Sequence, residues 1–339
     1  MVTSKARGRW VALLLAVLTP VVAEFTLGNP PLRQAYLLLL WVPIYGAGAV
    51  LVRELVCRSG RGWVAILLLG AAYGIVEEGL ALQALTSPTL YGVAGWAPRV
   101  LGLNSAYAEL NIPYHAVFSV AVPILLLDLI FPGLRRRPYL GRVGLVTSGV
   151  VFVLGAVLLR LMVAAVIDPG YQAPLAVVIG CLLAVALLAV IALRLTPRPT
   201  GPSPVAGGPP PGPLFVGGFG GVVVLGYLAL LFPFGGAEHP AFTRGGWVLV
   251  PMAAAAVLAV AAGWLLSRWT RGQAWGDRHS LALASGALVA HTVFGVIANG
   301  KTPTDRLSLA ALGVVMVGLL ALLGRHTRID IDEFAARVK

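Results

Sequence analysis

The sequence contains little charge and almost no cysteine. Only 11% of its 339 residues are charged, 58% are hydrophobic, and the mean hydropathy is +0.89. A typical soluble domain carries about a quarter charged residues, so this composition excludes an ordinary soluble globular protein. Cys57 and Cys181 are its two cysteines. They form neither a CxxC motif nor a metal-ligand spacing. We expect both cysteines to serve as small apolar residues in or near helices.

Acidic residues are the scarcer charge, with 13 against 25 basic residues and a formal net charge of +12. No basic stretch is interleaved with aromatic residues, so the excess does not predict nucleic acid as a partner. Basic residues collect in the cytoplasmic loops of membrane proteins, which explains the same excess. Arg greatly outnumbers Lys, and Ala, Gly and Val are abundant, as in proteins from GC-rich bacterial genomes. The composition therefore predicts a bacterial cell-membrane protein.

Long apolar runs take the place of the missing charge. Runs of about 20 residues predict an all-α, polytopic transmembrane helix bundle with about ten spans. The predicted spans are residues 10–26, 33–53, 63–85, 112–131, 144–166, 173–194, 214–233, 247–267, 280–299 and 307–324. A Pro/Gly-rich stretch lies between the sixth and seventh predicted spans. Such a stretch forms no packed element, so it is predicted to be a linker that divides the spans into two groups. The predicted segments are a six-helix part (1–195), the cytoplasmic linker (196–213), a four-helix part (214–324) and a cytoplasmic tail (325–339).

The basic residues predict the orientation of the bundle. With ten spans, 19 Lys and Arg residues fall on one side of the membrane and 5 on the other, while Arg160 lies within a span. The positive-inside rule then places both termini in the cytoplasm. In an alternative, the first apolar run is a cleaved signal peptide, with Val21 and Ala23 at the cleavage site. That alternative leaves nine spans and the same downstream orientation.

One predicted span carries two adjacent acids. In "LLLGAAYGIVEEGLALQAL", residues 67–85, Glu77 and Glu78 interrupt an otherwise apolar helix. Each carboxylate at mid-membrane costs roughly 2.5–3.5 kcal/mol, so the pair must face protein or a watery cavity. Adjacent helix positions diverge by about 100°, so we expect one acid to act while the other holds a partner. Gly70 and Gly74 predict that another helix approaches this span closely.

Further polar residues are predicted at the same depth, in the outer half of the membrane. Asn111 and His115 open the fourth span, four residues apart and hence on one helix face, with Asn111 as the expected helix cap. His291 lies past the middle of the ninth span, which Asn299 ends. Together with the two glutamates, these residues predict a site between the third, fourth and ninth spans that opens outward.

Three other acids lie near predicted span ends and are not assigned to this site. Glu24 is expected at the outer end of the first span. Glu54, next to Arg53, is expected to form a solvated pair at a cytoplasmic helix end, and Asp128 lies near the cytoplasmic end of its own helix.

A glutamate pair followed by single histidines on two later spans resembles the type II CAAX-prenyl-protease and bacteriocin-immunity superfamily of intramembrane proteases. The pattern of that superfamily is EExxxR, then FxxxH, then HxxxN or HxxxD. The corresponding stretches here read "EEGLAL", "NIPYH" and "HTVFG". Leu82 takes the place of the arginine, with Gln83 just beyond it, and Asn111 takes the place of the phenylalanine. Gly295 occupies the last polar position, with Asn299 four residues later.

The resemblance implies a glutamate-dependent intramembrane protease or hydrolase. Glu77 or Glu78 would act as the general base that takes a proton from water. His115 and His291 would orient that water or stabilise the oxyanion, and Asn299 would donate to it.

The resemblance leaves the ligands of the site open. Asn111 and Gln83 are the candidate substrate contacts, and the implied substrate is a membrane-embedded peptide or a lipid-linked molecule. Two carboxylates and two imidazoles (Glu77, Glu78, His115 and His291) can also hold a divalent metal such as zinc, although the sequence has no HExxH motif.

Two other functions fit the same residues. A proton- or ion-coupled transporter also uses intramembrane carboxylates and histidines. In its favour, "HAVFSV" in the fourth span resembles "HTVFGV" in the ninth, as an inverted repeat would require. The other alternative is a membrane scaffold without chemistry, in which neighbouring helices satisfy the glutamates. The lipid bilayer is the expected surrounding in every case.

Overall fold

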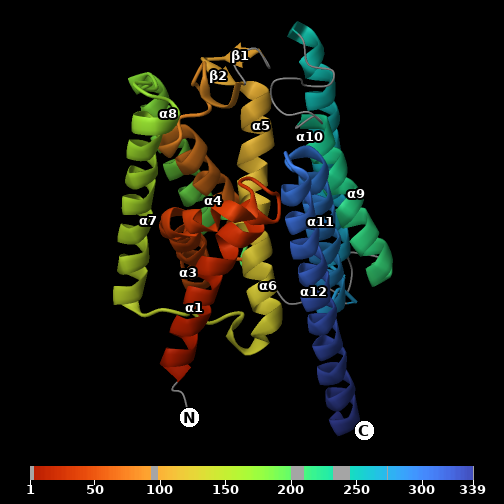
Figure 1. Cartoon of the computed structure of the whole chain (residues 1–339). Helices are drawn as coiled ribbons and strands as arrows, with labels where there is room; N and C mark the ends of the chain where they lie inside the picture. Colours follow the sequence, from red (N-terminus) through yellow and green to blue (C-terminus); the bar gives the residue numbers. More distant parts are fainter. Residues whose placement is uncertain (1–3, 93–97, 200–209, 232–244, 273, 339) are drawn as a thin grey trace.

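The computed structural model describes residues 4–92, 98–199, 210–231, 245–272 and 274–338 (Figure 1). Within these residues, ten helices are long and apolar enough to cross a membrane, which confirms the predicted all-α bundle of about ten spans. They are Arg7–Phe25, Leu32–Ser59, Trp63–Ala81, Ser105–Ile130, Arg142–Ile167, Leu175–Leu195, Pro213–Leu231, Gly246–Thr270, Asp277–Ala298 and Pro303–Arg325. Sheet is confined, in the described residues, to a two-stranded hairpin of β1 (Arg99–Val100) and β2 (Leu103–Asn104).

Most of these spans are built from more than one helical segment. The α-helices are α1 (Ser4–Pro20), α2 (Leu38–Trp41), α3 (Ala47–Ser59), α4 (Trp63–Ile75), α5 (Ser105–Tyr114), α6 (Val122–Ile130), α7 (Arg142–Met162), α8 (Leu175–Val190), α9 (Pro213–Leu231), α10 (Leu249–Thr270), α11 (Asp277–Ala298) and α12 (Pro303–Val338). Short 3₁₀ helices cover Leu32–Leu37, Leu90–Gly92, Pro132–Leu134 and Gly245–Val248.

Several spans contain π-helical segments. In the part of the chain that the structure describes, these are Val21–Phe25, Val42–Gly46, Val76–Ala81, His115–Ala121, Val163–Ile167 and Ile191–Leu195. A π-helical turn makes i→i+5 hydrogen bonds, is rare, and occurs most often at functional sites. The first four segments lie in the first four spans, which makes the interior between those spans the place to search for a site.

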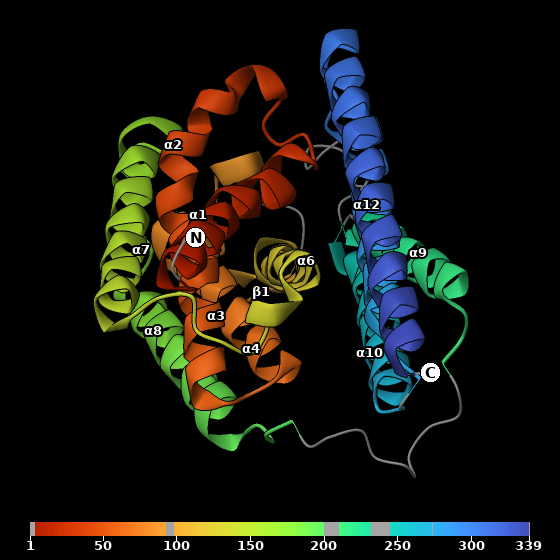
Figure 2. The same ribbon diagram turned by 90° about the horizontal axis from the view of Figure 1, so that it is seen from below.

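The helices form two groups that meet at α6. Viewed from below in Figure 2, α9, α10 and α12 lie on one side of α6, and α1 to α4, α7 and α8 lie on the other. α11 packs against α9, α12 and α6. Residues 200–209 of the predicted linker lie outside the described residues, and the division into a six-helix and a four-helix part stays a prediction.

Burial distinguishes central from peripheral spans. About 67% of the most apolar window in Ser105–Ile130 is buried inside the protein, against 6% in Pro303–Arg325 and 11% in Leu175–Leu195. Exposed valine and leucine side chains on the peripheral helices suit a lipid surrounding, because lipid tails are as apolar as these residues. A polar side chain on the first four spans therefore faces protein on most sides.

The predicted close approach to the third span is confirmed. An added Cβ at Gly70 would lie 2.8 Å from the Cα of Ala116, and one at Gly74 would lie 3.2 Å from the Cβ of His115. The α4 backbone thus lies directly against the π-helical segment of the fourth span. This contact brings Glu77 and Glu78, at the end of α4, level with His115.

The fourth span begins earlier than expected, which corrects the assignment of Asn111 as its cap. The side chain of Asn104 caps α5 by accepting a hydrogen bond from the Tyr107 backbone N–H at 3.0 Å. Pro113 lies inside α5, and the π-helical segment begins two residues later. The cap was misplaced because residues 104–111 include several polar side chains and form no apolar run, so the first turns of the helix were not predicted.

The last helix also departs from the expected boundary. α12 continues without a break from Pro303 to Val338, so the backbone of the predicted tail extends the last span as a helix.

Candidate functional site

Four π-helical segments bring polar side chains together in the interior of the first four spans. Glu24 lies in Val21–Phe25, Tyr45 in Val42–Gly46, Glu77 and Glu78 in Val76–Ala81, and His115 begins His115–Ala121. We call this group the acid–histidine cluster. Its members are Glu24, Tyr45, Tyr73, Glu77, Glu78, Tyr107, His115 and Ser119.

Glu78 makes the shortest contact between an acid and the histidine of this cluster. Its Oε1 lies 3.0 Å from His115 Nε2, and its Oε2 accepts a hydrogen bond from the Tyr107 hydroxyl at 2.9 Å. Glu78 and His115 are each 3% exposed. Both carboxylate oxygens therefore have partners, and the carboxylate is held in one orientation by an imidazole and a phenol.

Glu77 approaches the other nitrogen of the same ring. Its Oε2 lies 3.3 Å from His115 Nδ1, which also lies 2.8 Å from the Ser119 hydroxyl. The two adjacent acids were expected to point about 100° apart, but both reach the same ring, while their separate roles stay a prediction. The wider π-helical turn at Val76–Ala81 and the length of the glutamate side chain let both carboxylates reach one imidazole from its two sides.

Glu24 is a third acid of the cluster, and the sequence analysis did not assign it to the site. Its Oε1 accepts a hydrogen bond from the Tyr45 hydroxyl at 2.6 Å, and the residue is 9% exposed. The first span therefore ends deep in the protein instead of at a solvated outer boundary. The signal was present in the sequence, because Glu24 lies within the predicted apolar span 10–26 and not beyond it.

Two buried oxygens of the cluster have no hydrogen-bond partner among the described residues. They are Oε2 of Glu77, whose contact is the ion pair with His115, and the hydroxyl of Tyr73. Tyr73 interacts electrostatically with Glu77. A buried polar atom without a hydrogen bond costs roughly 1–3 kcal/mol, so such atoms mark a place for water, a shared proton or a polar group of a substrate.

The charges of the cluster do not balance. Three carboxylates face one imidazole, and Glu77, His115 and Glu78 are the charged groups that act on Glu24. Full ionisation would leave a net negative charge in a low-dielectric interior, which costs several kcal/mol per unpaired ion. The cluster therefore requires protons, a property suited to acid–base chemistry.

His291 lies beside the cluster and not within it. Its Nε2 lies 2.9 Å from the Tyr114 hydroxyl and its Nδ1 lies 3.0 Å from the Thr26 hydroxyl. The ring is fully buried and stacks on Phe118 with centroids 4.1 Å apart. Both ring nitrogens are occupied by neutral hydroxyls, so the structure does not bring His291 to the glutamates as the sequence analysis expected.

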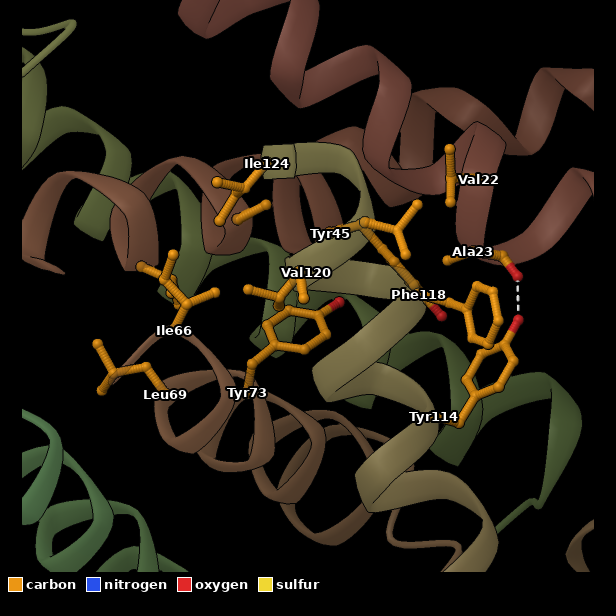
Figure 3. Packing of buried hydrophobic residues seen from close by; sticks show 14 of the residues in the cluster. Val22, Ala23, Tyr45, Ile66, Leu69, Tyr73, Tyr114, Phe118, Val120 and Ile124 are labelled. Carbon is orange, nitrogen blue, oxygen red and sulfur yellow. Dashed lines mark hydrogen bonds between the residues drawn. The ribbon is translucent and has the colours of Figure 1, made fainter. Parts of the chain in front are cut away.

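Tyr114 connects His291 to the cluster. Its hydroxyl also donates to the Ala23 carbonyl, next to Glu24, as Figure 3 shows. Its ring meets the His115 ring edge-on, with centroids 5.5 Å apart. His291 therefore fixes a tyrosine that packs against His115.

Asn299 and Gly295 fix the chain that follows Glu24. The Asn299 amide donates to the Leu27 carbonyl at 2.9 Å. A Cβ at Gly295 would overlap that same carbonyl. The polar residue that the protease pattern requires at position 295 cannot fit, because the backbone of the first connection occupies its space.

An arginine of another span contacts the end of the segment that carries the two glutamates. Arg160, which the sequence analysis left unassigned within the fifth span, donates through Nη1 to the Leu82 carbonyl at 3.2 Å and through Nη2 to the Tyr171 carbonyl at 2.8 Å. A guanidinium thus reaches the end of the π-helical segment that carries the glutamates, from a helix that the spacing of the motif does not include.

Gln83 and Asn111 are placed away from the carboxylates. The Gln83 side-chain oxygen accepts a hydrogen bond from the Ala173 backbone N–H at 2.7 Å, and the Asn111 amide donates to the Tyr107 carbonyl of its own helix at 3.1 Å. Both side chains make contacts that hold the backbone. Their assignment as substrate contacts stays a prediction.

The described residues do not assemble the zinc site that the sequence allowed. No group of three or more His, Cys, Asp or Glu side chains in this part of the chain is placed to hold a metal ion. Zinc requires ligands at about 2.0–2.2 Å that converge on one point. The two acids instead flank the His115 ring, and His291 points at hydroxyls.

A second buried group of charges lies at the far end of α3. We call it the arginine–acid cluster, with members Arg53, Glu54, Arg58, Asp128 and Tyr139. Arg53 is 3% exposed and Glu54 0%, so the expectation of a solvated pair at this helix end is wrong. Burial raises the pKa of the Tyr139 hydroxyl above its usual value, so this phenol stays neutral.

Every charge of the arginine–acid cluster has an opposite charge nearby. Arg53 lies 3.7 Å from Glu54 and 3.5 Å from Asp128, and it donates to the Leu134 carbonyl at 2.8 Å. Glu54 also accepts from the Tyr139 backbone N–H at 2.6 Å and pairs with Arg58 at 3.3 Å. The sequence does not reveal this burial, because it depends on the loop after α6, whose backbone carbonyls fold back over α3.

Comparison with known proteins identifies the family of the chain. Residues 13–325 match the family described as "Uncharacterized membrane protein family", and the chain belongs to it. No curated protein and no solved structure matches the chain. The match establishes an integral membrane protein, and the resemblance to the CAAX-type protease superfamily stays a hypothesis about the site.

Proposed function

We propose that this integral membrane protein is a glutamate-dependent intramembrane protease whose reactive centre is the acid–histidine cluster. One observation carries the proposal: Glu77 and Glu78 face the two nitrogens of a single buried imidazole, at 3.3 and 3.0 Å. A general base needs a neighbour that orients it and a site from which bulk water is excluded. The positive-inside orientation, with both termini cytoplasmic, puts this centre in the outer half of the cell membrane.

In this proposal, Glu78 is the base that takes a proton from the attacking water. Tyr107 and His115 hold its two oxygens, so its lone pairs point in a fixed direction. His115 then carries the second role through its positive charge when protonated, which stabilises the oxygen that becomes negative, while its two nitrogens stay against Glu78 and Ser119. Ser119 and Glu77 on the other side of the ring support the protonated imidazole.

The order of the motifs along the chain supports the same proposal. An acid pair, a first histidine and a second histidine occupy the third, fourth and ninth spans, as in the superfamily that the sequence resembles. His291 and Asn299 act here as positioning residues, because they contact Tyr114 and Leu27 instead of the glutamates. The substrate class is a peptide embedded in the membrane.

The test is a comparison of peptide ends in membranes of cells that express the wild-type chain, Glu78→Gln or Glu109→Gln. Glu109 is a matched control, since it is a half-buried glutamate of the neighbouring fourth span and lies outside the cluster. We expect new peptide N-termini with the wild type and with Glu109→Gln, and their loss with Glu78→Gln. Identical N-termini in all three membranes would contradict proteolysis.

Glu24 favours a second candidate, a proton-coupled transporter. A third acid on the first span, bonded to Tyr45, extends the polar network over four spans, which a hydrolytic centre does not need. Purified protein in vesicles loaded with a pH-sensitive dye tests this function. Dye response that is lost in Glu78→Gln, with no new peptide ends in cells, would select the transporter.

A further inference from the structure

We propose that Glu24 is a third proton-binding residue of the centre and exchanges a proton with Glu77 through the hydroxyl of Tyr45. This inference goes beyond the proposed function by adding a third acid that exchanges a proton with Glu77, the acid next to the proposed base. It does not depend on which reaction the proton serves.

The geometry of Glu24 gives the first argument. Its Oε1 lies 2.6 Å from the Tyr45 hydroxyl, a short O–H···O hydrogen bond along which a proton can pass. The residue lies in a π-helical turn at the end of α1. Asn299 and Gly295 fix the chain directly after it, through the Leu27 carbonyl. Glu24 is thus held in place on both sides.

Tyr45 supplies the connection to the glutamate pair. Its hydroxyl donates to Glu24, and its ring contacts His115, whose Nδ1 lies 3.3 Å from Glu77. Its ring packs against the rings of Tyr73 and His115, with centroids 5.8 and 6.1 Å apart. A tyrosine hydroxyl both donates and accepts, so it can pass a proton between two carboxylates without changing its own state.

The transfer balances in one step. Tyr45 gives its hydroxyl proton to Oε1 of Glu24 and takes the proton of Glu77, so the phenol is restored. The net change is one proton moved from Glu77 to Glu24. No electron, metal or further reactant takes part.

The surroundings of Glu24 favour a bound proton there. The titratable groups that face it from the neighbouring elements are Tyr45, Tyr73, Glu77, Glu78, Tyr114 and His115. Two of the three charged groups among them are acids, and the single imidazole is already flanked by those acids. An ionised Glu24 would therefore lack a cation of its own, whereas a protonated one hydrogen-bonds without that cost.

Infrared spectroscopy of the full chain in lipid nanodiscs tests the inference, because protonated carboxyl groups absorb apart from carboxylates and amides. We expect Glu24→Gln to remove the absorbance of one protonated carboxyl at neutral pH. Asp277→Asn is the control, since this acid is 39% exposed and paired with Arg135 at 2.9 Å, and it should leave the band unchanged. A band of equal size in the wild type and Glu24→Gln would overturn the inference.

Tyr45→Phe provides a second, independent readout. It keeps Glu24 but removes the hydroxyl, so the carboxyl band should move to the frequency of a more weakly bonded group. Tyr36→Phe, at a tyrosine that is 67% exposed, is the matched control. An unmoved band in Tyr45→Phe would show that the two groups are not coupled. Neither measurement needs a substrate, so absence of proteolysis would refute the proposed function and leave this inference standing on its own data.

Discussion

The acid–histidine cluster and the arginine–acid cluster are both buried, but only one of them balances its charges. In the arginine–acid cluster, the two arginines Arg53 and Arg58 offset the charges of Glu54 and Asp128. In the acid–histidine cluster, three carboxylates surround one imidazole, so negative charge is in excess. Both clusters contain buried polar atoms without a hydrogen-bond partner among the described residues, so charge balance is what separates them. A structural cluster needs balanced charges, whereas an excess of carboxylates suits a group of residues that takes up and releases protons.

The local backbone differs in the same way. Arg53 and Glu54 lie in the regular α-helix Ala47–Ser59, while each charged residue of the acid–histidine cluster lies in a π-helical segment. A π-helical turn is less stable than an α-helical one and persists where packing compensates for it. The contrast predicts that substitutions damage activity in the acid–histidine cluster and stability in the arginine–acid cluster.

The largest expected effect is the loss of activity in Glu78→Gln. Removing a general base lowers the rate by about 10²–10⁴-fold. The unfolding temperature should stay the same or rise, because glutamine keeps the size of the side chain and relieves the negative excess around His115. The rate of peptide release checks the expected loss of activity, and thermal unfolding in detergent checks the expected unfolding temperature. A fall in stability with retained activity would place this cluster with the structural one.

Arg53→Met should have the largest effect on stability. Removing Arg53 takes away the ion-pair partner of Asp128 and leaves Glu54 with the partly exposed Arg58, and loss of one partner of a buried ion pair costs about 3–5 kcal/mol. Arg136→Met, at an exposed arginine of the adjoining loop, is the control and should be neutral. Chemical unfolding in detergent measures both variants. Equal stability of Arg53→Met and the wild type would mean that the balanced charges do not hold the fold.

Gly70→Ala tests whether the contact between the glutamates of the third span and His115 of the fourth depends on the close approach of these two spans. The added Cβ would lie 2.8 Å from the Ala116 Cα, so backbone must move, at a cost of about 1–3 kcal/mol. The glutamates would also shift relative to His115, and activity should fall with stability. Gly180→Ala has no atom within 4 Å of its added Cβ and should be neutral or slightly stabilising.

The sequence was sufficient for the architecture because each span is a long apolar run. Apolar length predicts a membrane helix without knowledge of its neighbours, and all ten predicted runs overlap the ten helices of the structure. The start of the fourth span was misplaced, since Asn104 and not Asn111 caps it. A polar first turn carries no apolar signal.

The site was predicted only where its residues contrast with a membrane span. Glu77, Glu78 and His115 stood out because charge is costly there. Tyr45, Tyr73, Tyr107 and Ser119 did not, because such side chains are ordinary in membrane helices and their roles come from which helix they face. The rotation of α11 likewise decides that His291 meets Tyr114 instead of Glu78.

Ser119→Ala should have a smaller effect within the acid–histidine cluster. It removes the hydroxyl 2.8 Å from His115 Nδ1 but leaves Glu77 near the same nitrogen. A single hydrogen bond contributes about 0.5–1.5 kcal/mol, which corresponds to a roughly 2- to 10-fold lower rate. Ser148→Ala, whose hydroxyl bonds to its own helix on α7, serves as the control. A loss as large as that of Glu78→Gln would show that Ser119 itself takes part in the reaction.

Arg58→Ala should have the smallest effect and separates the two arginines that contact Glu54. The Arg58 side chain is 30% exposed and pairs with Glu54 across one helical turn at 3.3 Å. Partly exposed pairs of this kind contribute about 0–1 kcal/mol, because water and salt screen them. Glu54 also keeps Arg53 and the Tyr139 N–H as partners. Unfolding measured at low and high salt should show a difference between wild type and Arg58→Ala that shrinks as salt rises. A cost matching that of Arg53→Met would mean that the arginine–acid cluster stabilises the fold as one coupled network. Burial of a single arginine would then not be what distinguishes this cluster from the acid–histidine cluster.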